Sequence, residues 1–330
     1  MATKIYIDQG HNPVNPNAGA EGFGYREQDL VYRIGILLAG ILERRGFETR
    51  LSRKSPDVIL GTTNLTSLAA RVNEANAWGA DYFISLHTNA SANVSARGSE
   101  ALVYSSPSEA SELAEDILFQ LNISTGLPDR GITERPGLYV LRKTRMPATL
   151  IELGFITNPT DARLMAESPE LFAVGIADGI SEYLGGAVLS ASYPEENSGN
   201  RENDGVSDSL DVDEFLRENS SVGALKIWAY LARGAYPVSD VRVEVSRDFE
   251  DGERVFFSGV TDESGIIDGI ELPAPPRENS LQFDSPDKVA VYRLRAIHPK
   301  FEELTRAVEI FDGIKTIQPL AMIPRREGED

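Results

Sequence analysis

WGADYFISLH (78–87) contains the end of a predicted helix and the whole of the predicted strand that follows it. Residues 65–78 place apolar side chains at helical spacing, and the Gly79 that follows is a residue type that commonly ends a helix. The apolar run Asp81–Leu86 then predicts a buried strand, with His87 directly at its carboxyl end. A helix that leads into a buried strand is typical of a parallel sheet covered by helices.

The same alternation of strands and helices continues on both sides of this stretch. On the N-terminal side it predicts strands at 4–8 and 47–51 and a helix at 29–45. On the C-terminal side it predicts strands at 98–104, 138–141 and 149–153 and helices at 108–121, 161–167 and 169–184. The predicted fold class for residues 1–189 is therefore α/β, a mostly parallel sheet flanked by helices.

Beyond this body the pattern changes twice. Residues 190–221 are polar, acidic and poor in large apolar side chains, which predicts a flexible linker that is helical only near 211–217. Residues 222–330 contain short β-rich runs separated by Gly, Pro and Asp, which predicts a second domain, an all-β sandwich.

Composition narrows the possible functions of the 330-residue chain. There are no cysteines, so a metal can be held only by His, Asp or Glu. The formal net charge of −19 argues against nucleic acid as a partner. No apolar run is long enough to span a membrane, and the first residues lack the basic and apolar pattern of a secretory signal. The sequence leaves the oligomeric state open.

Two of the three histidines follow predicted strands. His11 lies in IDQGHNP (7–13) after the first strand, and His87 follows the strand at 81–86. Ligands of open α/β sheets bind at the carboxyl ends of the strands, and Glu27, at the start of the first long helix, can reach the same edge. Two imidazoles and one carboxylate suit a catalytic Zn²⁺ ion, with a fourth position left for water.

Glu152 is the candidate for proton transfer. It lies in TLIELGF (149–155), a run otherwise apolar enough to form a buried strand. Burial of a carboxylate is unfavourable without a partner, and burial raises its pKa, which suits a group that takes a proton from water and delivers it to a leaving amine.

Each of these residues taken alone has an ordinary structural explanation. A histidine in a loop is usually a surface residue or hydrogen-bonded, and Glu27 could simply complement the helix dipole. Glu152 could form an ion pair with Arg142 or Arg145. The third histidine, His298, precedes a proline in the β-rich region and is predicted to be structural.

The flanking residues resemble the zinc-dependent N-acetylmuramoyl-L-alanine amidase (Amidase_3) family. The resemblance covers about 180 residues, with its blocks in family order. These blocks are IYIDQGHNP (5–13), NAGAEGFGYREQDL (17–30), TRLSR (49–53), RVNEAN (71–76), FISLHTNAS (83–91), GSEALVY (98–104), RGI (130–132) and LYVLRKTRMPATLIELGFITNPTDARLM (138–165).

The resemblance implies an amidase/phosphorylase-like fold and hydrolysis of the amide between N-acetylmuramic acid and L-alanine of peptidoglycan. It implies His11, Glu27 and His87 as zinc ligands and Glu152 as the catalytic carboxylate. The chain departs from the family in having Gln9-Gly10-His11-Asn12 where Pro-Gly-His-Gly is usual. It also has one helix-length pattern between residues 104 and 130, which implies an open site without an inhibitory helix.

Two further residues in the family blocks have no assigned role. Asn89 could bind near the site or form hydrogen bonds at the end of its strand. Arg71 could act near the site or form a salt bridge on the helix surface.

The C-terminal region resembles, more weakly, transthyretin-like or carboxypeptidase-regulatory-like β-sandwiches, through PVSDVRVEV (237–245), TDESGIIDGIELPAP (261–275) and YRLRAIHPKF (292–301). This resemblance suggests wall attachment or assembly, with an inert spacer as the alternative.

The alternative to an enzyme is a non-catalytic wall-binding or activator protein on an amidase scaffold. An amidase of this kind acts on the cell wall, as an autolysin or in sporulation. With no signal peptide in this chain, it would reach the wall by cell lysis, by phage-style export, or as part of a longer protein.

Overall fold

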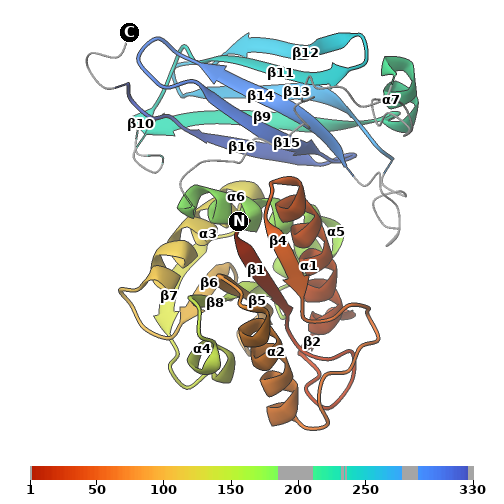
Figure 1. Cartoon of the computed structure of the whole chain (residues 1–330), viewed down its shortest axis with the longest axis vertical. Helices are drawn as coiled ribbons and strands as arrows, with labels where there is room; N and C mark the ends of the chain where they lie inside the picture. Colours follow the sequence, from red (N-terminus) through yellow and green to blue (C-terminus); the bar gives the residue numbers. More distant parts are fainter. Residues whose placement is uncertain (1, 185–210, 232–233, 235, 277–288, 326–330) are drawn as a thin grey trace, which may run out of the picture. The chain divides into compact units, whose positions relative to one another are not determined.

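The computed structural model describes residues 2–184, 211–231, 234, 236–276 and 289–325. The chain divides into two compact units, Met1–Leu189 and Ser190–Asp330, and each is described here by itself (Figure 1). Across the described residues, no helix combines the length and apolar character needed to cross a bilayer.

The first unit is built on a six-stranded sheet with the order β4-β1-β5-β8-β6-β7. Its strands are β1 (Lys4–Gln9), β4 (Glu48–Leu51), β5 (Tyr82–Asn89), β6 (Ser99–Val103), β7 (Asp129–Glu134) and β8 (Ala148–Phe155). Every pair of neighbours is parallel except β6 and β8, which are antiparallel. The prediction of a mostly parallel sheet is confirmed.

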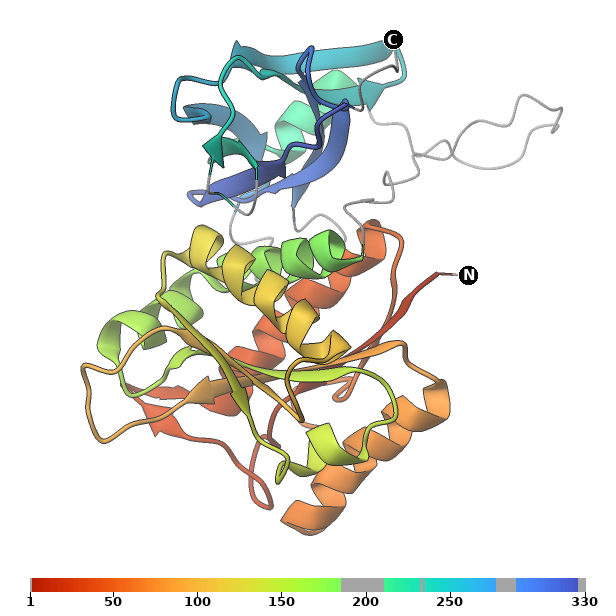
Figure 2. The same ribbon diagram turned by 90° about the vertical axis from the view of Figure 1, so that its left-hand side faces the viewer.

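Helices cover both faces of this sheet (Figure 2). One face carries α1 (Glu27–Arg44), α3 (Glu109–Thr125) and α6 (Pro169–Tyr183), with α5 (Pro159–Glu167) packed against α6 and β8. The other face carries α2 (Asn64–Trp78) and α4 (Tyr139–Lys143). This coverage explains why β1 and β5 are buried over almost their whole length.

Local sequence determines where α2 begins and ends. Thr63 and Thr66 form a reciprocal capping box at its start, and Gly79 ends it in the left-handed conformation with φ 68. Between these ends, Val72 and Ala75 are buried against Phe83 of β5 in one apolar cluster. The helix therefore presents one face firmly to the sheet.

One predicted strand is wrong. Residues 138–141 were expected to be extended, but Tyr139–Lys143 form the short helix α4. Val140 and Leu141 are adjacent in the chain and both buried in the cluster between α2 and the sheet. Neighbouring side chains of a strand point to opposite faces, so a single helical turn is the conformation that buries both on the same side.

The second unit contains two four-stranded sheets. One has the order β10-β9-β13 with β16 paired to β9, and the other has the order β12-β11-β14-β15. The strands are β9 (Ser221–Leu231), β10 (Tyr236–Pro237), β11 (Arg242–Phe249), β12 (Gly252–Val260), β13 (Ile266–Ala274), β14 (Ala290–Ile297), β15 (Leu304–Ile310) and β16 (Lys315–Ala321). The prediction of a second, all-β region is confirmed.

A single apolar core lies between these two sheets. Along β14 every second residue is buried, so one face of the strand points into the core. Leu225 and Ile227 of β9 meet Val243 and Val245 of β11 in this core.

The predicted linker at 190–221 falls partly outside the described residues, because 185–210 are not described. Its last part forms helix α7 (Val212–Glu218) and the first residue of β9. Val212 and Phe215 of α7 belong to the core of the second unit.

Candidate active site

His11 lies in the loop that follows β1, in an unusual backbone conformation. Its φ is 66, in the left-handed region that costs a non-glycine residue about 1–2 kcal/mol. The N–H of Gly10 donates to the carbonyl of Leu86 at 3.0 Å, which ties the loop to β5. A Cβ atom on Gly10 would lie 2.6 Å from Cε1 of His87, so only glycine permits this close approach. The loop thereby brings His11 next to His87.

Glu27 is the first residue of α1 and is only 3% exposed. Two backbone N–H groups orient its carboxylate: that of Ala20 donates to Oε2 and that of Thr88 donates to Oε1, both at 2.9 Å. A Cβ atom on Gly19 would lie 2.8 Å from Oε2, so this glycine also leaves room for the carboxylate. The position of Glu27 is therefore determined by its surroundings.

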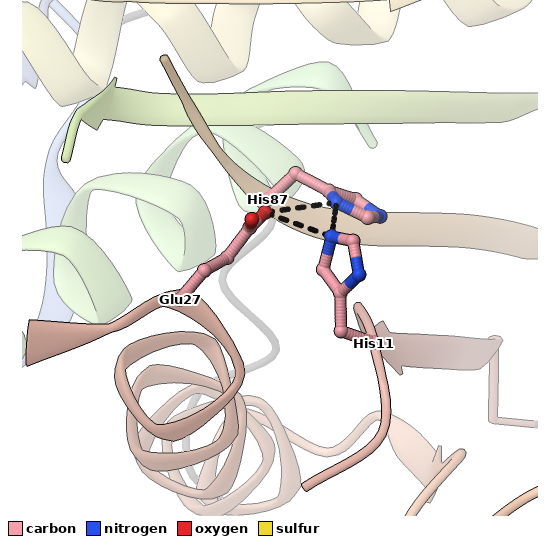
Figure 3. Close-up of side chains that lie close together, drawn as sticks. All are labelled: His11, Glu27 and His87. Carbon is pink, nitrogen blue, oxygen red and sulfur yellow. Dashed lines mark hydrogen bonds and ion pairs between the residues drawn. The ribbon is translucent and has the colours of Figure 1, made fainter. Parts of the chain in front are cut away.

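His87 completes a triangle of ligand-type atoms (Figure 3). Nδ1 of His87 lies 3.1 Å from Nε2 of His11 and 3.1 Å from Oε1 of Glu27. Nε2 of His11 lies 3.1 Å from the same Oε1. The other ring nitrogen of His11, Nδ1, donates to the carbonyl of Asn17 at 3.3 Å. This hydrogen bond leaves the lone pair of Nε2 available as one corner of the triangle.

These three atoms fit a zinc ion. Tetrahedral zinc with bonds of about 2.0–2.1 Å separates its ligand atoms by roughly 3.3 Å, close to the three distances above. The donor set, two imidazoles and a carboxylate, is also one that catalytic zinc uses. These are the atoms in the described part of the chain that could together hold a metal ion. His298 lies in the second unit, where its Nδ1 accepts from the N–H of Lys300.

Electrostatics keep Glu27 ionised. Burial alone would raise the pKa of Glu27, but the hydrogen bonds and charges of His11 and His87 outweigh burial and hold that pKa well below its usual range. The pKa of His87 is raised because its hydrogen bond to Glu27 and the charge of Glu27 exceed the opposing effect of burial. A carboxylate that stays charged at neutral pH is what a metal ligand requires.

Glu152 lies beside His87 in the next strand of the sheet. The two residues are partners in the parallel pairing of β5 and β8. Oε2 of Glu152 is buried and has no hydrogen-bond partner among the described residues. Burial raises the pKa of Glu152 to about 7; the charges of Glu27 and Glu100 act in the same direction, and that of His87 opposes them.

The sequence left an ion pair with Arg142 or Arg145 as the alternative explanation of Glu152. The charged groups that act on Glu152 are instead His87, Glu27 and Glu100. Glu100 is its antiparallel partner on β6 and accepts a hydrogen bond from Nδ2 of Asn89 at 2.6 Å. A row of polar side chains thus crosses the sheet through Glu152.

Sequence reasoning missed the polar groups that hold the His11 loop. Arg71 was given two alternatives, a role near the site or a salt bridge on the helix surface. Its side chain is 1% exposed and contacts Asp8, which excludes the surface alternative. Asn12 is fully buried. Its Nδ2 donates to the carbonyl of Leu60, and its Oδ1 accepts from the N–H of Leu60, both at 3.0 Å. The RVNEAN block drew attention to Arg71, but its periodicity does not reveal which face of α2 is buried.

Comparisons with known proteins identify the family to which the chain belongs. The sequence profile described as N-acetylmuramoyl-L-alanine amidase matches residues 5–182 of the chain. The chain belongs to the N-acetylmuramoyl-L-alanine amidase family. The predicted enzyme class, an amidase that acts on the N-acetylmuramoyl-L-alanine bond, is thereby confirmed, and peptidoglycan is the substrate that this family implies.

Individual members of the family resemble the first unit. The amidase CwlM of Bacillus licheniformis is 33% identical over 183 residues, which are 54% of this chain and 67% of that protein. The sporulation-specific amidase of Bacillus subtilis is 34% identical over 184 residues, again 54% of this chain and 67% of that protein. The crystal structure of an amidase from Clostridium difficile 630 matches with 30% identity and a TM-score of 0.50, over 56% of this chain and 97% of that one.

Proposed function

We propose that the chain hydrolyses the amide between N-acetylmuramic acid and L-alanine of peptidoglycan with a zinc ion held by His11, Glu27 and His87. The observation that carries this proposal is the triangle of Nε2, Oε1 and Nδ1 atoms, each 3.1 Å from the other two. Two imidazole nitrogens and a carboxylate oxygen that face one point form a donor set that catalytic zinc uses. When bound, zinc would polarise the scissile carbonyl and lower the pKa of a water molecule.

Glu152 is proposed to move the protons. Its unpartnered Oε2 atom is buried beside His87, so it can accept a proton from the attacking water. The protonated carboxyl group can then donate this proton to the nitrogen of the leaving L-alanine. A pKa of about 7 suits both steps, because neither the ionised nor the protonated form is strongly disfavoured near neutral pH.

The test is to incubate intact peptidoglycan with the wild type and with Glu152→Gln, both loaded with zinc, and to label the new amino termini. The wild type should release L-alanine termini, and Glu152→Gln should be slower by about 10²–10⁴-fold because proton transfer is lost. The zinc content of the two proteins should be equal, since Glu152 is not among the three ligands. His11→Ala should lose both the zinc and the activity.

Glu100→Gln is the matched control, because it neutralises the neighbouring carboxylate on β6. Its rate should fall far less than that of Glu152→Gln. Equal losses in the two variants would contradict the role of Glu152. Binding to the wall without new termini from the wild type would favour a non-catalytic wall-binding or activator protein. New termini other than L-alanine would show that the enzyme cleaves a different bond.

We infer an accessory role for the second unit, residues 222–330 by the sequence-based boundary. Its two packed sheets are compatible with a transthyretin-like or carboxypeptidase-regulatory-like domain. Attachment to the cell wall is the proposed role, with an inert spacer as the alternative. The similarity to a sporulation-specific amidase of Bacillus subtilis supports a function in wall lysis during sporulation, and phage-style lysis is the second candidate.

A further inference from the structure

Arg71 is a deeply buried charged group near the proposed metal site. It lies on α2, yet its side chain is 1% exposed and points to the end of β1 and the loop after it. Its charge is balanced by Asp8 of β1, whose Oδ1 accepts from Nη1 at 2.5 Å. A buried arginine with a carboxylate partner could be purely structural, so its other contacts decide what else it does.

The same guanidinium group binds the backbone on both sides of Gly10. Nη1 donates to the carbonyl of Gln9 at 2.7 Å, and Nη2 donates to the carbonyl of His11 at 2.5 Å. The planar, rigid fork of arginine can hold several oxygens in fixed relative positions, which the single ammonium group of lysine cannot do.

The contact with His11 bears on the direction of its ring. With φ 66, the backbone of His11 has a conformation that histidine rarely adopts unless its surroundings enforce it. The carbonyl of His11 is bound by Arg71, and Nε2 on the other side of the residue faces Glu27 and His87. The hydrogen bond from Arg71 therefore anchors the backbone from which this ring extends.

Arg71 also connects the two histidine segments. Oδ2 of Asp8 accepts from Oγ of Ser85 at 2.8 Å, and Ser85 precedes His87 by two positions on β5. The network Ser85–Asp8–Arg71 therefore joins the strand that carries His87 to the loop that carries His11. Each member is at most 1% exposed, so water does not compete for these hydrogen bonds.

We propose that Arg71 is a positioning residue of the metal site, which holds His11 in its left-handed conformation so that Nε2 meets the other two ligands. This inference rests on the proposed zinc site. Removal of outer-shell partners of metal ligands typically lowers metal affinity by about 10–100-fold, and we expect a change of this size when the fork is lost.

The experiment compares Arg71→Gln and Arg71→Lys with Arg45→Gln in the full chain. Arg45 is a matched control, because it is 2% exposed and paired through Nη1 with Asp178 at 2.8 Å, between α1 and α6. Three quantities are measured: the zinc dissociation constant by competition with a chelator, the visible spectrum of the cobalt-substituted protein, and the urea midpoint of the metal-free protein.

Arg71→Gln and Arg45→Gln should both lower the urea midpoint, because each removes the guanidinium group that pairs with a buried carboxylate. Only Arg71→Gln should weaken zinc binding, by about 10–100-fold, and change the cobalt spectrum. Arg71→Lys keeps a positive charge beside Asp8 but lacks the forked guanidinium group. Relative to Arg71→Gln, it should restore much of the urea midpoint and little of the zinc affinity.

Zinc affinity of Arg71→Lys within twofold of the wild type, or an equal loss of affinity in Arg45→Gln, would overturn the positioning role. A failure of the metal site itself is distinguished by His11→Ala, since unchanged zinc binding in that variant would contradict the proposed ligands and not the role of Arg71. If Arg71→Gln does not fold, Arg71→Lys still decides the question.

Discussion

The carboxyl group of Glu152 is harder to ionise in the folded protein than in the unfolded chain. Burial raises its pKa from 4.5 to about 7 when no metal is bound. Because its pKa is raised, Glu152 binds its proton more tightly in the native state than in the unfolded chain. Its contribution to the free energy of unfolding is therefore fully present below pH 4.5 and is lost as the pH rises through 7. Glutamine at this position does not titrate.

We therefore expect metal-free Glu152→Gln to gain stability over the wild type as the pH is raised from 4 to 8. The gain should be on the order of 3 kcal/mol, since each pKa unit corresponds to about 1.4 kcal/mol. Urea unfolding of both proteins in the presence of a chelator measures the difference, and the remaining titrating groups cancel between them. Parallel stability curves over this range would show that Glu152 is not buried as described.

Among the elements, α3 and α6 pack closely together. Gly175 and Gly179 lie one turn apart on the face of α6 that contacts α3. A Cβ atom on Gly179 would lie 2.4 Å from Cα of Ile117, and one on Gly175 would lie 2.4 Å from Oγ of Ser124. The backbones approach so closely here that only glycine fits.

Gly179→Ala should accordingly destabilise the first unit by about 1–3 kcal/mol, because the added methyl group forces the helices apart. Gly40→Ala is the matched control in α1, where the new Cβ atom would meet only Nη1 of Arg44, at 3.4 Å. That change should stabilise the protein by about 0.5–1 kcal/mol through helix propensity. Thermal or urea unfolding separates the two effects, and a loss of stability in both variants would contradict this account of the contact.

At the scale of the whole molecule, the proposed site residues come from one of the two units. His11, Glu27, His87 and Glu152 all lie within Met1–Leu189, as do the described groups that orient them. The second unit has its own core between its two sheets. The core clusters described for the two units have no residue in common.

We expect a protein that comprises residues 1–189 to fold and to bind zinc within about twofold of the full chain. Its rate on a soluble muramoyl-peptide should also be unchanged, whereas its rate on intact wall should fall if the second unit attaches to the wall. Chelator competition and amino-terminal labelling provide the measurements. An unfolded or metal-free product would mean that the units depend on each other.

Much of the fold could be predicted because the pattern of apolar residues reports which side of each element is buried. The alternating β14 and the largely apolar run Tyr82–Leu86 of β5 are examples. That pattern does not report which strands pair. The antiparallel placement of β6 beside β8, the strand β16 beside β9, and the helical turn at Tyr139–Lys143 are results of long-range packing.

The sequence by itself determined the kinds of group available to the site. Without cysteine, and with two histidines and two glutamates at or near strand and helix ends, it favoured a His–Glu–His zinc site with a nearby carboxylate. Only the tertiary structure decided that His11 and His87, 76 positions apart, bring their nitrogens to 3.1 Å. It also decided that Arg71 contacts the His11 loop, because the partners of a buried polar side chain depend on which segments pack against α2.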